Sequence, residues 1–231
     1  MKARVDVVEH DGTLDLRVDG ALMSSIRPGG ATTHPVWEAL GAPLVALPEA
    51  SRRSILLLGL GGGAVARVAR ALSPHARIVA VDHDREVVAA ARQHFGLADL
   101  DVEVVVEEAR AFLEREHRLY DAILEDIFVG PGRRLRKPDW LPEPGLTLAL
   151  DRLNPRGFLA SNTIHERATI ARALLCHRPA LVEIAVEDYY NHILVAGPAS
   201  WSAGSLRRVL ATEPRLRSTL PRLNLRTLKQ A

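Results

Sequence analysis

The chain has 231 residues, 47% of them hydrophobic and 25% charged, with a formal net charge of +2 and one cysteine, Cys176. The length suits a single domain with a small appendage, since domains commonly hold about 100–200 residues. No run approaches the ~18 apolar residues of a membrane span, and no apolar segment follows the basic residues at the N-terminus. The composition predicts a soluble, cytoplasmic protein and excludes an internal disulfide.

The positive charge comes almost entirely from arginine, because lysine occurs only at Lys2, Lys137 and Lys229. Aromatic residues make up 4% of the chain, which is too few for a platform that stacks single-stranded nucleic acid. The arginine content is typical of a GC-rich genome. A nucleic-acid surface is therefore not favoured.

Residues 1–50 begin with apolar side chains that alternate with polar ones on both sides of His10-Asp11-Gly12. Asp-Gly between two alternating runs is a strong signal for a tight turn. We predict a small N-terminal β-hairpin followed by a lead-in helix.

Residues 51–200 alternate short apolar runs with segments of helical period, which predicts an α/β domain with a mostly parallel sheet and helices on both faces. The expected strands are residues 54–58, 78–81, 102–106, 120–125 and 157–161. The expected helices are residues 63–72, 85–95, 109–116, 145–153 and 165–176.

Two further β-rich runs, residues 180–187 and 191–196, are joined by a connection too short for a parallel crossover. They predict an antiparallel final hairpin and a sheet of seven strands. Residues 201–231 are rich in arginine, and their leucines lie at helical spacing. We predict a basic helical tail.

The segment Leu58-Gly59-Leu60-Gly61-Gly62-Gly63-Ala64 joins the first expected strand of this domain to its first helix. Gly59-x-Gly61-x-x-Ala64 matches the dinucleotide fingerprint, with Asp82 near the position of the ribose-binding acid. Gly59-x-Gly61-x-Gly63 matches the tighter loop of S-adenosyl enzymes equally well. The loop alone leaves NAD and an S-adenosyl compound open, and it excludes a Walker loop because no G-K-[ST] follows.

Six segments in order resemble the spermidine synthase-like branch of the class I S-adenosylmethionine-dependent methyltransferase superfamily, over roughly residues 12 to 198. They are LLLGLGGGAVARVAR, IVAVDHD, VVVEEARAFL, YDAILEDIF, LNPRGFLASN and NHILVA. The resemblance implies a Rossmann-like methyltransferase fold. It also implies that the cofactor is S-adenosylmethionine or its decarboxylated form.

The same resemblance assigns roles to individual residues. The glycines would pass the methionine portion, Asp82 would hold the ribose hydroxyls with Asp84 close by, and Glu108 would lie beside the adenine. Asp126 matches the family's catalytic aspartate and would accept a proton from the acceptor or orient it. Glu125 should point to the opposite face of its strand. The implied donor-binding residues are Gly59, Gly61, Gly63, Asp82, Asp84 and Glu108.

The chain departs from the aminopropyl-transferring members of the family at three places. Gly62 stands where they carry an acid, and Val129 stands where they carry a second aspartate. The segment Val36-Trp37-Glu38 replaces a tyrosine and a glutamine that hold the diamine. Because an acidic loop would repel the carboxylate of intact S-adenosylmethionine and glycine amides would accept it, we expect methyl transfer to a small-molecule acceptor.

Other functions stay open at this point: an aminopropyltransferase that uses the decarboxylated donor and a diamine, a catalytically silent S-adenosyl-binding protein, and an NAD-dependent oxidoreductase. Trp37, Glu38 and Asn162 are expected near the acceptor. The basic loop of residues 130–138 is either a solvated loop or a lid that recruits an anionic substrate. The nine histidines lack metal-binding spacing, so no metal is expected, and the resemblance predicts a homodimer.

Overall fold

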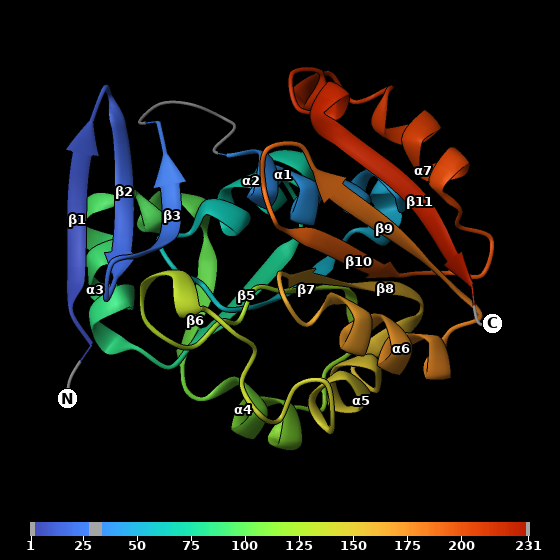
Figure 1. Ribbon diagram of the computed structural model, residues 1–231, viewed down its shortest axis with the longest axis horizontal. Coiled ribbons are helices and arrows are strands. Elements are labelled where there is room, and N and C mark those ends of the chain that lie inside the picture. The colour runs from blue at the N-terminus through green and yellow to red at the C-terminus, as the bar shows by residue number, and fades with distance from the viewer. Residues whose placement is uncertain (1–2, 28–33, 230–231) are drawn as a thin grey trace.

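The computed structural model describes residues 3–27 and 34–229, which form a three-stranded sheet and an eight-stranded sheet with helices packed against the larger one (Figure 1). In the larger sheet the strand order is β11-β9-β10-β8-β7-β4-β5-β6. Its strands are β4 (Ser54–Leu58), β5 (Arg77–Asp82), β6 (Val102–Val106), β7 (Tyr120–Glu125), β8 (Leu153–Thr163), β9 (Ala180–Val186), β10 (His192–Ala196) and β11 (Leu223–Lys229).

Strands β4 to β8 of this sheet pair in parallel, as predicted. Strand β10 lies between β8 and β9 and is antiparallel to both, so the expected final hairpin is present. The predicted α/β architecture is therefore correct. The carboxyl ends of the parallel strands lie along one edge of the sheet, where open sheets of this kind bind ligands.

Helices cover both faces of the large sheet (Figure 1). Strand β4 shows how the sequence directs this, because Ile55 and Leu57 belong to one buried cluster while Leu56 and Leu58 belong to the other. The first cluster is covered by α1 (Pro35–Gly41), α2 (Ala64–Leu72), α3 (Arg85–His94) and α7 (Ala203–Leu210). The second is covered by α4 (Ala109–Arg115), α5 (Gly145–Leu150) and α6 (Arg167–His177).

The N-terminal segment is a three-stranded antiparallel sheet, not the predicted two-stranded hairpin. Its strands are β1 (Val5–His10), β2 (Thr13–Val18) and β3 (Ala21–Ile26). The two turns are Asp11-Gly12 and Asp19-Gly20, and all four residues have positive φ. The second Asp-Gly pair is a turn signal as strong as the first, but Ser24 and Ser25 interrupt the apolar alternation of β3 although both are buried.

The C-terminal segment corrects a second prediction. Helix α7 forms, but residues 223–229 are strand β11, which pairs antiparallel with β9 along its whole length. The large sheet consequently has eight strands where seven were predicted, and the expected wholly helical tail is wrong. Leucine spacing alone could not separate a short edge strand from a helical turn.

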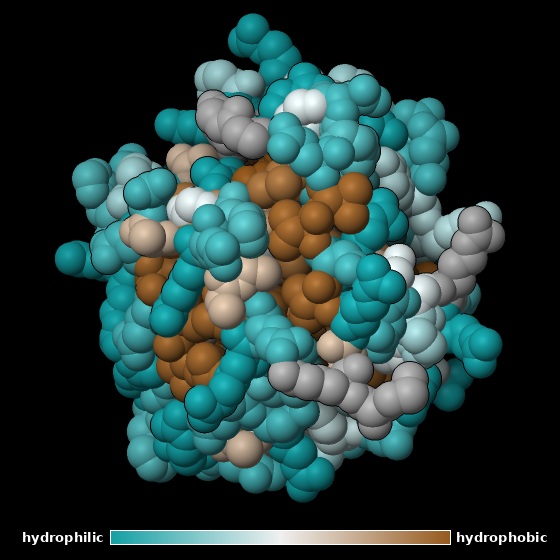
Figure 2. All heavy atoms as spheres, turned by 90° about the vertical axis from the view of Figure 1, so that its left-hand side faces the viewer, coloured by the Kyte–Doolittle hydropathy of each residue, from teal (hydrophilic) through white to brown (hydrophobic). Residues whose placement is uncertain are grey.

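The side of the molecule on which β1 lies is shown in Figure 2, where hydrophobic side chains gather toward the middle and hydrophilic side chains surround them.

Among the described helices, none combines the length and the hydropathy needed to cross a bilayer.

Candidate functional site

A cavity of about 850 Å³ opens at the carboxyl ends of β4, β5 and β7. Its walls come from the glycine loop after β4, from β3 and α1, from the loop after β7, and from the β9–β10 connection. This is the switch-point edge of the sheet, and the volume lies within the range of small-molecule sites.

The glycine loop packs closely against backbone from other parts of the chain. A Cβ atom at Gly59, where φ is +91°, would lie 2.7 Å from the backbone oxygen of Asp126. A Cβ atom at Gly61 would lie 2.8 Å from the backbone oxygen of Met23. Glycine at these two positions therefore lets the loop pass between β7 and β3, and the backbone of both residues lines the cavity.

The amide groups of this loop are already bonded within the protein. Leu60 N and Gly61 N donate to Asp82 Oδ2 at 3.1 and 3.2 Å, and Gly62 N donates to Ser24 Oγ at 2.8 Å. The expectation that the loop amides would accept the carboxylate of an intact donor therefore does not fit this geometry.

Gly62 faces a filled space. A Cβ atom there would lie 2.8 Å from Ser24 Cβ and 3.0 Å from Phe95 Cδ1. The position at which related aminopropyl-transferring enzymes carry an acid is consequently closed in this chain. Gly63 is the N-cap of α2 with φ of +84°, and a Cβ atom there would lie 3.3 Å from Leu97 Cδ1. Unlike Gly59 and Gly61, Gly63 is not among the described residues that line the cavity.

Three of the expected acids line the cavity, Asp82 and Asp84 at the end of β5 and Glu108 after β6. Asp82 closes β5 and accepts from Asp84 N through Oδ1 at 3.0 Å. Asp84 caps α3 by accepting from Glu86 N at 2.8 Å, so its carboxylate already has a structural role. Glu108 precedes α4 without making a capping hydrogen bond, which leaves its carboxylate available to a ligand.

Asp126 follows β7 and is held by two uncharged donors. Trp37 Nε1 donates to Oδ2 at 3.0 Å, and Asn162 Nδ2 donates to Oδ1 at 2.7 Å. Burial raises the pKa of Asp126 from 3.8 to about 6, although the two donors and the charge of Lys137 act in the opposite direction. A carboxyl group with such a pKa can accept a proton at neutral pH and release it again.

The wall beside Asp126 is aromatic and uncharged. The His34 ring lies 4.9 Å from the Trp37 ring and 4.6 Å from the Tyr189 ring, between centroids. Burial, with a smaller effect from Arg222, lowers the pKa of His34 to about 4, so this side chain is neutral at physiological pH. Asn191 Nδ2 donates to Asn162 Oδ1 at 2.9 Å and thereby orients the amide that binds Asp126.

Glu125 and Asp126 point to opposite faces, as expected for neighbours at a strand end. Glu125 is bonded to Lys137 and Ser161 in the interior, while Asp126 faces the cavity. Lys137 is buried, although its basic loop was predicted to be either a solvated loop or a lid. The side chain of Arg133 lies outside what the structure describes.

The structure corrects the expected acceptor residues at one position. Trp37 and Asn162 line the cavity, but Glu38 points away from it, is buried, and accepts a hydrogen bond from Thr219 Oγ1. Adjacent residues of a helix face different directions, and Glu38 faces the C-terminal segment. The contributions of Ser24, His34 and Asn191 were missed, because they depend on long-range contacts with no local motif.

The charge of the cavity is negative. Among the described residues that line it, six are acids and none is lysine or arginine: Asp19, Asp82, Asp84, Glu107, Glu108 and Asp126. Such a lining favours a cationic ligand over an anionic one. Across residues 3–27 and 34–229, no group of three or more His, Cys, Asp or Glu could hold a metal ion.

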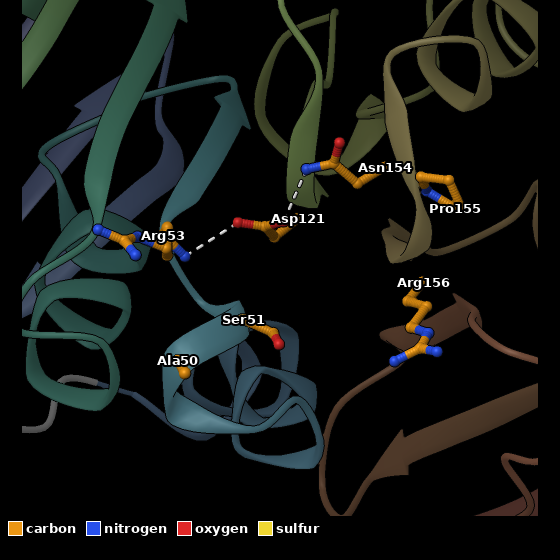
Figure 3. A pocket seen from close by; sticks show the side chains of 7 residues that line it. All are labelled: Ala50, Ser51, Arg53, Asp121, Asn154, Pro155 and Arg156. Carbon is orange, nitrogen blue, oxygen red and sulfur yellow. Dashed lines mark hydrogen bonds between the residues drawn. The ribbon is translucent and has the colours of Figure 1, made fainter.

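A second hollow, of about 410 Å³, lies at the opposite edge of the sheet, near the amino ends of β4, β7 and β8 (Figure 3). Asp121 lies in it, but its carboxylate accepts from the amides of Arg53 and Ser54 and from Asn154 Nδ2. These bonds tie three strand ends together, so the role of Asp121 is structural.

No family model matches the chain. Among curated proteins, the chain is similar to polyamine aminopropyltransferase 2 of Pseudomonas aeruginosa, with 30% identity over 128 aligned residues. The aligned region covers 53% of this chain and 35% of the relative. It is 25% identical over 179 residues to an eEF1A lysine and N-terminal methyltransferase homolog of Drosophila pseudoobscura pseudoobscura, covering 71% of this chain and 27% of the relative. The chain thus spans about a third of the length of these relatives.

Two solved structures extend the comparison to almost the whole chain. A probable spermidine synthase from Corynebacterium glutamicum superposes with a TM-score of 0.77 and 20% identity, over 97% of this chain and 87% of that chain. Human methyltransferase-like protein 13 in complex with SAH superposes with a TM-score of 0.61 and 21% identity, over 80% and 89%. These similarities confirm the predicted resemblance to the spermidine synthase-like branch and the Rossmann-like methyltransferase fold.

Proposed function

We propose that the cavity binds an S-adenosyl donor and that the chain transfers the donor's methyl group to a small amine. The observation that carries the proposal is the position of Asp126. Its carboxylate, held by Trp37 and Asn162, faces the same cavity as the glycine loop, Asp82 and Glu108.

The polar groups that line the cavity fit the adenosyl part of such a donor. Asp82 Oδ2 accepts from two loop amides and Oδ1 accepts from one amide, so Oδ1 keeps a second lone pair with which it can accept from a ribose hydroxyl. Glu108 can accept from the exocyclic amine of adenine. The acidic lining suits the positive sulfonium, and the loop at Gly59 and Gly61 brings bare backbone beside it.

The chemistry asked of the protein is modest, because the sulfonium of the donor supplies an already activated methyl group. The chain must exclude water and hold the nucleophile in line with that carbon. Asp126 holds the amine by a hydrogen bond and accepts the proton that the nitrogen loses when the new C–N bond forms. The aromatic wall of His34, Trp37 and Tyr189 keeps this step dry.

Two positions favour methyl transfer over aminopropyl transfer. Ser24 and Phe95 fill the space in front of Gly62, so no acid fits there to bind the ammonium of a decarboxylated donor. Val129 lines the cavity where a second acid would hold the far end of a diamine. An ammonium group left without a partner at either place would carry a desolvation cost.

Aminopropyl transfer is the second candidate, and a specific observation favours it. The described lining offers no lysine or arginine to the carboxylate of intact S-adenosylmethionine, and the loop amides are taken. The similarity to proteins named polyamine aminopropyltransferase points the same way.

Calorimetry with S-adenosylmethionine, its decarboxylated form, S-adenosylhomocysteine, methylthioadenosine and NAD separates the candidates. We expect the S-adenosyl compounds to bind and NAD not to bind, and a preference for the intact donor over the decarboxylated one would support methyl transfer. A preference for the decarboxylated donor would establish the second candidate. A screen of amines for methylated product, with Asp126→Asn as the inactive control, then tests turnover, and binding without turnover of any amine would leave a silent binding protein.

A further inference from the structure

A buried ion pair lies directly behind Asp126. Lys137 Nζ donates to Glu125 Oε1 at 2.6 Å, and the side chains of both residues are only 1% exposed. The same ammonium lies 4.0 Å from the centre of the Phe128 ring. Charges buried so deeply are costly, and replacing such a pair by apolar residues often stabilises a protein. Stability alone is therefore a weak reason for its presence.

The pair holds the residue that follows Asp126, Ile127, by both of its backbone polar groups. Ile127 N donates to Glu125 Oε1 at 2.7 Å, and Lys137 Nζ donates to Ile127 O at 3.0 Å. Ser161 Oγ donates to Glu125 Oε2 at 2.5 Å, which anchors the pair to β8. Since Asp126 N also donates to Leu58 O, the backbone on each side of Asp126 is fixed.

The two charges act on Asp126 in opposite directions. Lys137 lowers its pKa and Glu125 raises it, with Lys137 the stronger influence. The other side chains that bond Asp126, Trp37 and Asn162, are uncharged, and His34 behind Trp37 is neutral above a pH of about 4. Asp82 lines the same cavity and accepts two amides of the glycine loop.

We propose that Glu125 and Lys137 are positioning residues for the proposed reaction: they fix the orientation of the Asp126 carboxylate and set the balance between its protonated and ionised forms. Neither touches the cavity. The role of Asp126 as proton acceptor rests on the proposed function, but the control that the pair exerts on Asp126 can be measured without any donor or acceptor.

The probe is the indole N–H of Trp37, which donates directly to Asp126. Its NMR signal, assigned by its loss in Trp37→Phe, should titrate with the Asp126 carboxyl in the unliganded protein. Glu125→Gln preserves the shape of the side chain and removes the negative charge, so the midpoint should fall. Lys137→Met removes the positive charge, so the midpoint should rise. We expect shifts of roughly half a pH unit or more.

The opposite shifts of the titration midpoint in the two variants distinguish a positioning role from a structural one. Both variants break one ion pair and should lower the melting temperature alike, whereas a pair with a merely structural role would move the titration in neither variant or in the same direction in both. The double variant Glu125→Gln/Lys137→Met buries no unpaired charge and keeps the test available if a single variant folds poorly. Its midpoint should lie between those of the single variants.

Glu116→Gln is the matched control, since Glu116 pairs with Arg118 at the other end of β7 and is far from the cavity in the fold. It should lower the melting temperature and leave the Trp37 titration unchanged. Titrations that do not move in the Glu125 and Lys137 variants, or that move together, overturn the inference. Failure of donor binding would overturn the proposed function and leave this result intact.

Discussion

Replacing Asp126 by asparagine should stabilise the protein at high pH while abolishing transfer. The native state raises the pKa of this carboxyl from 3.8 to about 6, chiefly because burial disfavours the charged form. A raised acid pKa means that the folded state binds its proton more tightly than the unfolded state. Stability is therefore lost as the pH rises from about 4 to about 6, and the loss is complete above that range.

The magnitude follows from the same two values. The cost of ionising the carboxyl is roughly 3 kcal/mol at pH 8 and less than about 1 kcal/mol at pH 4. Asparagine carries no such cost, but it offers one acceptor oxygen where Asp126 offers two, so either Trp37 Nε1 or Asn162 Nδ2 loses a partner at about 1 kcal/mol. The stability difference between variant and wild type should accordingly grow by roughly 2 kcal/mol between pH 4 and pH 8.

Urea denaturation of both proteins at several pH values measures this difference directly. Comparing the variant with the wild type at each pH cancels the contributions of the other acids, which are the same in both. A stability difference that stays constant from pH 4 to pH 8, or that falls, would refute the claim that Asp126 is held in the native state at an energetic cost. A substitution that raises the stability of the protein and abolishes transfer is typical of a residue kept for function, not for stability.

Three further substitutions test the rest of the site. Gly62→Asp should lower stability by about 2 kcal/mol or more in denaturation experiments, because its Cβ would meet Ser24, and calorimetry should show no gain in affinity for the decarboxylated donor. Thr219→Val should cost about 1–3 kcal/mol by removing the hydroxyl that donates to buried Glu38, without changing donor affinity. Trp37→Phe removes a hydrogen-bond donor to Asp126, the proposed proton acceptor, so the pH midpoint of the transfer rate should move upward.

The parallel part of the fold was predictable because its strands are continuous apolar runs with helices at regular spacing. Strands β4, β6 and β7 begin and end at the predicted residues. Edge strands β3 and β11 were missed for a physical reason. Strand β3 carries Ser24 and Ser25 among its six residues, and four of the seven residues of β11 are polar. Strand β11 is stabilised by pairing with β9, a contact that no local pattern encodes.

The lining of the cavity was predictable where a residue's position follows from a strand end, as for Asp82 and Asp126. It was not predictable where the role depends on which face of a helix is turned inward. Trp37 and Glu38 are neighbours in α1, yet one reaches Asp126 and the other reaches Thr219. The burial of Lys137 is a similar case, because a charged loop is expected in solvent until the partner Glu125 is located.

The site also bears on how a single carboxyl group could take the proton from an amine acceptor. In water an amine holds its proton far more tightly than an aspartate does, and an ammonium nitrogen cannot attack a methyl group. Burial raises the pKa of Asp126 and would lower that of an amine bound beside it, so both changes narrow the gap that the proton must cross. Lys137 limits the rise, and this matters because a protonated Asp126 could not take up the departing proton. On the proposed mechanism, a higher pKa would leave less of the Asp126 carboxyl ionised and able to accept the proton, and a lower pKa would make it a weaker base. A variant that removes the charge of Glu125 or of Lys137 should therefore slow transfer at neutral pH.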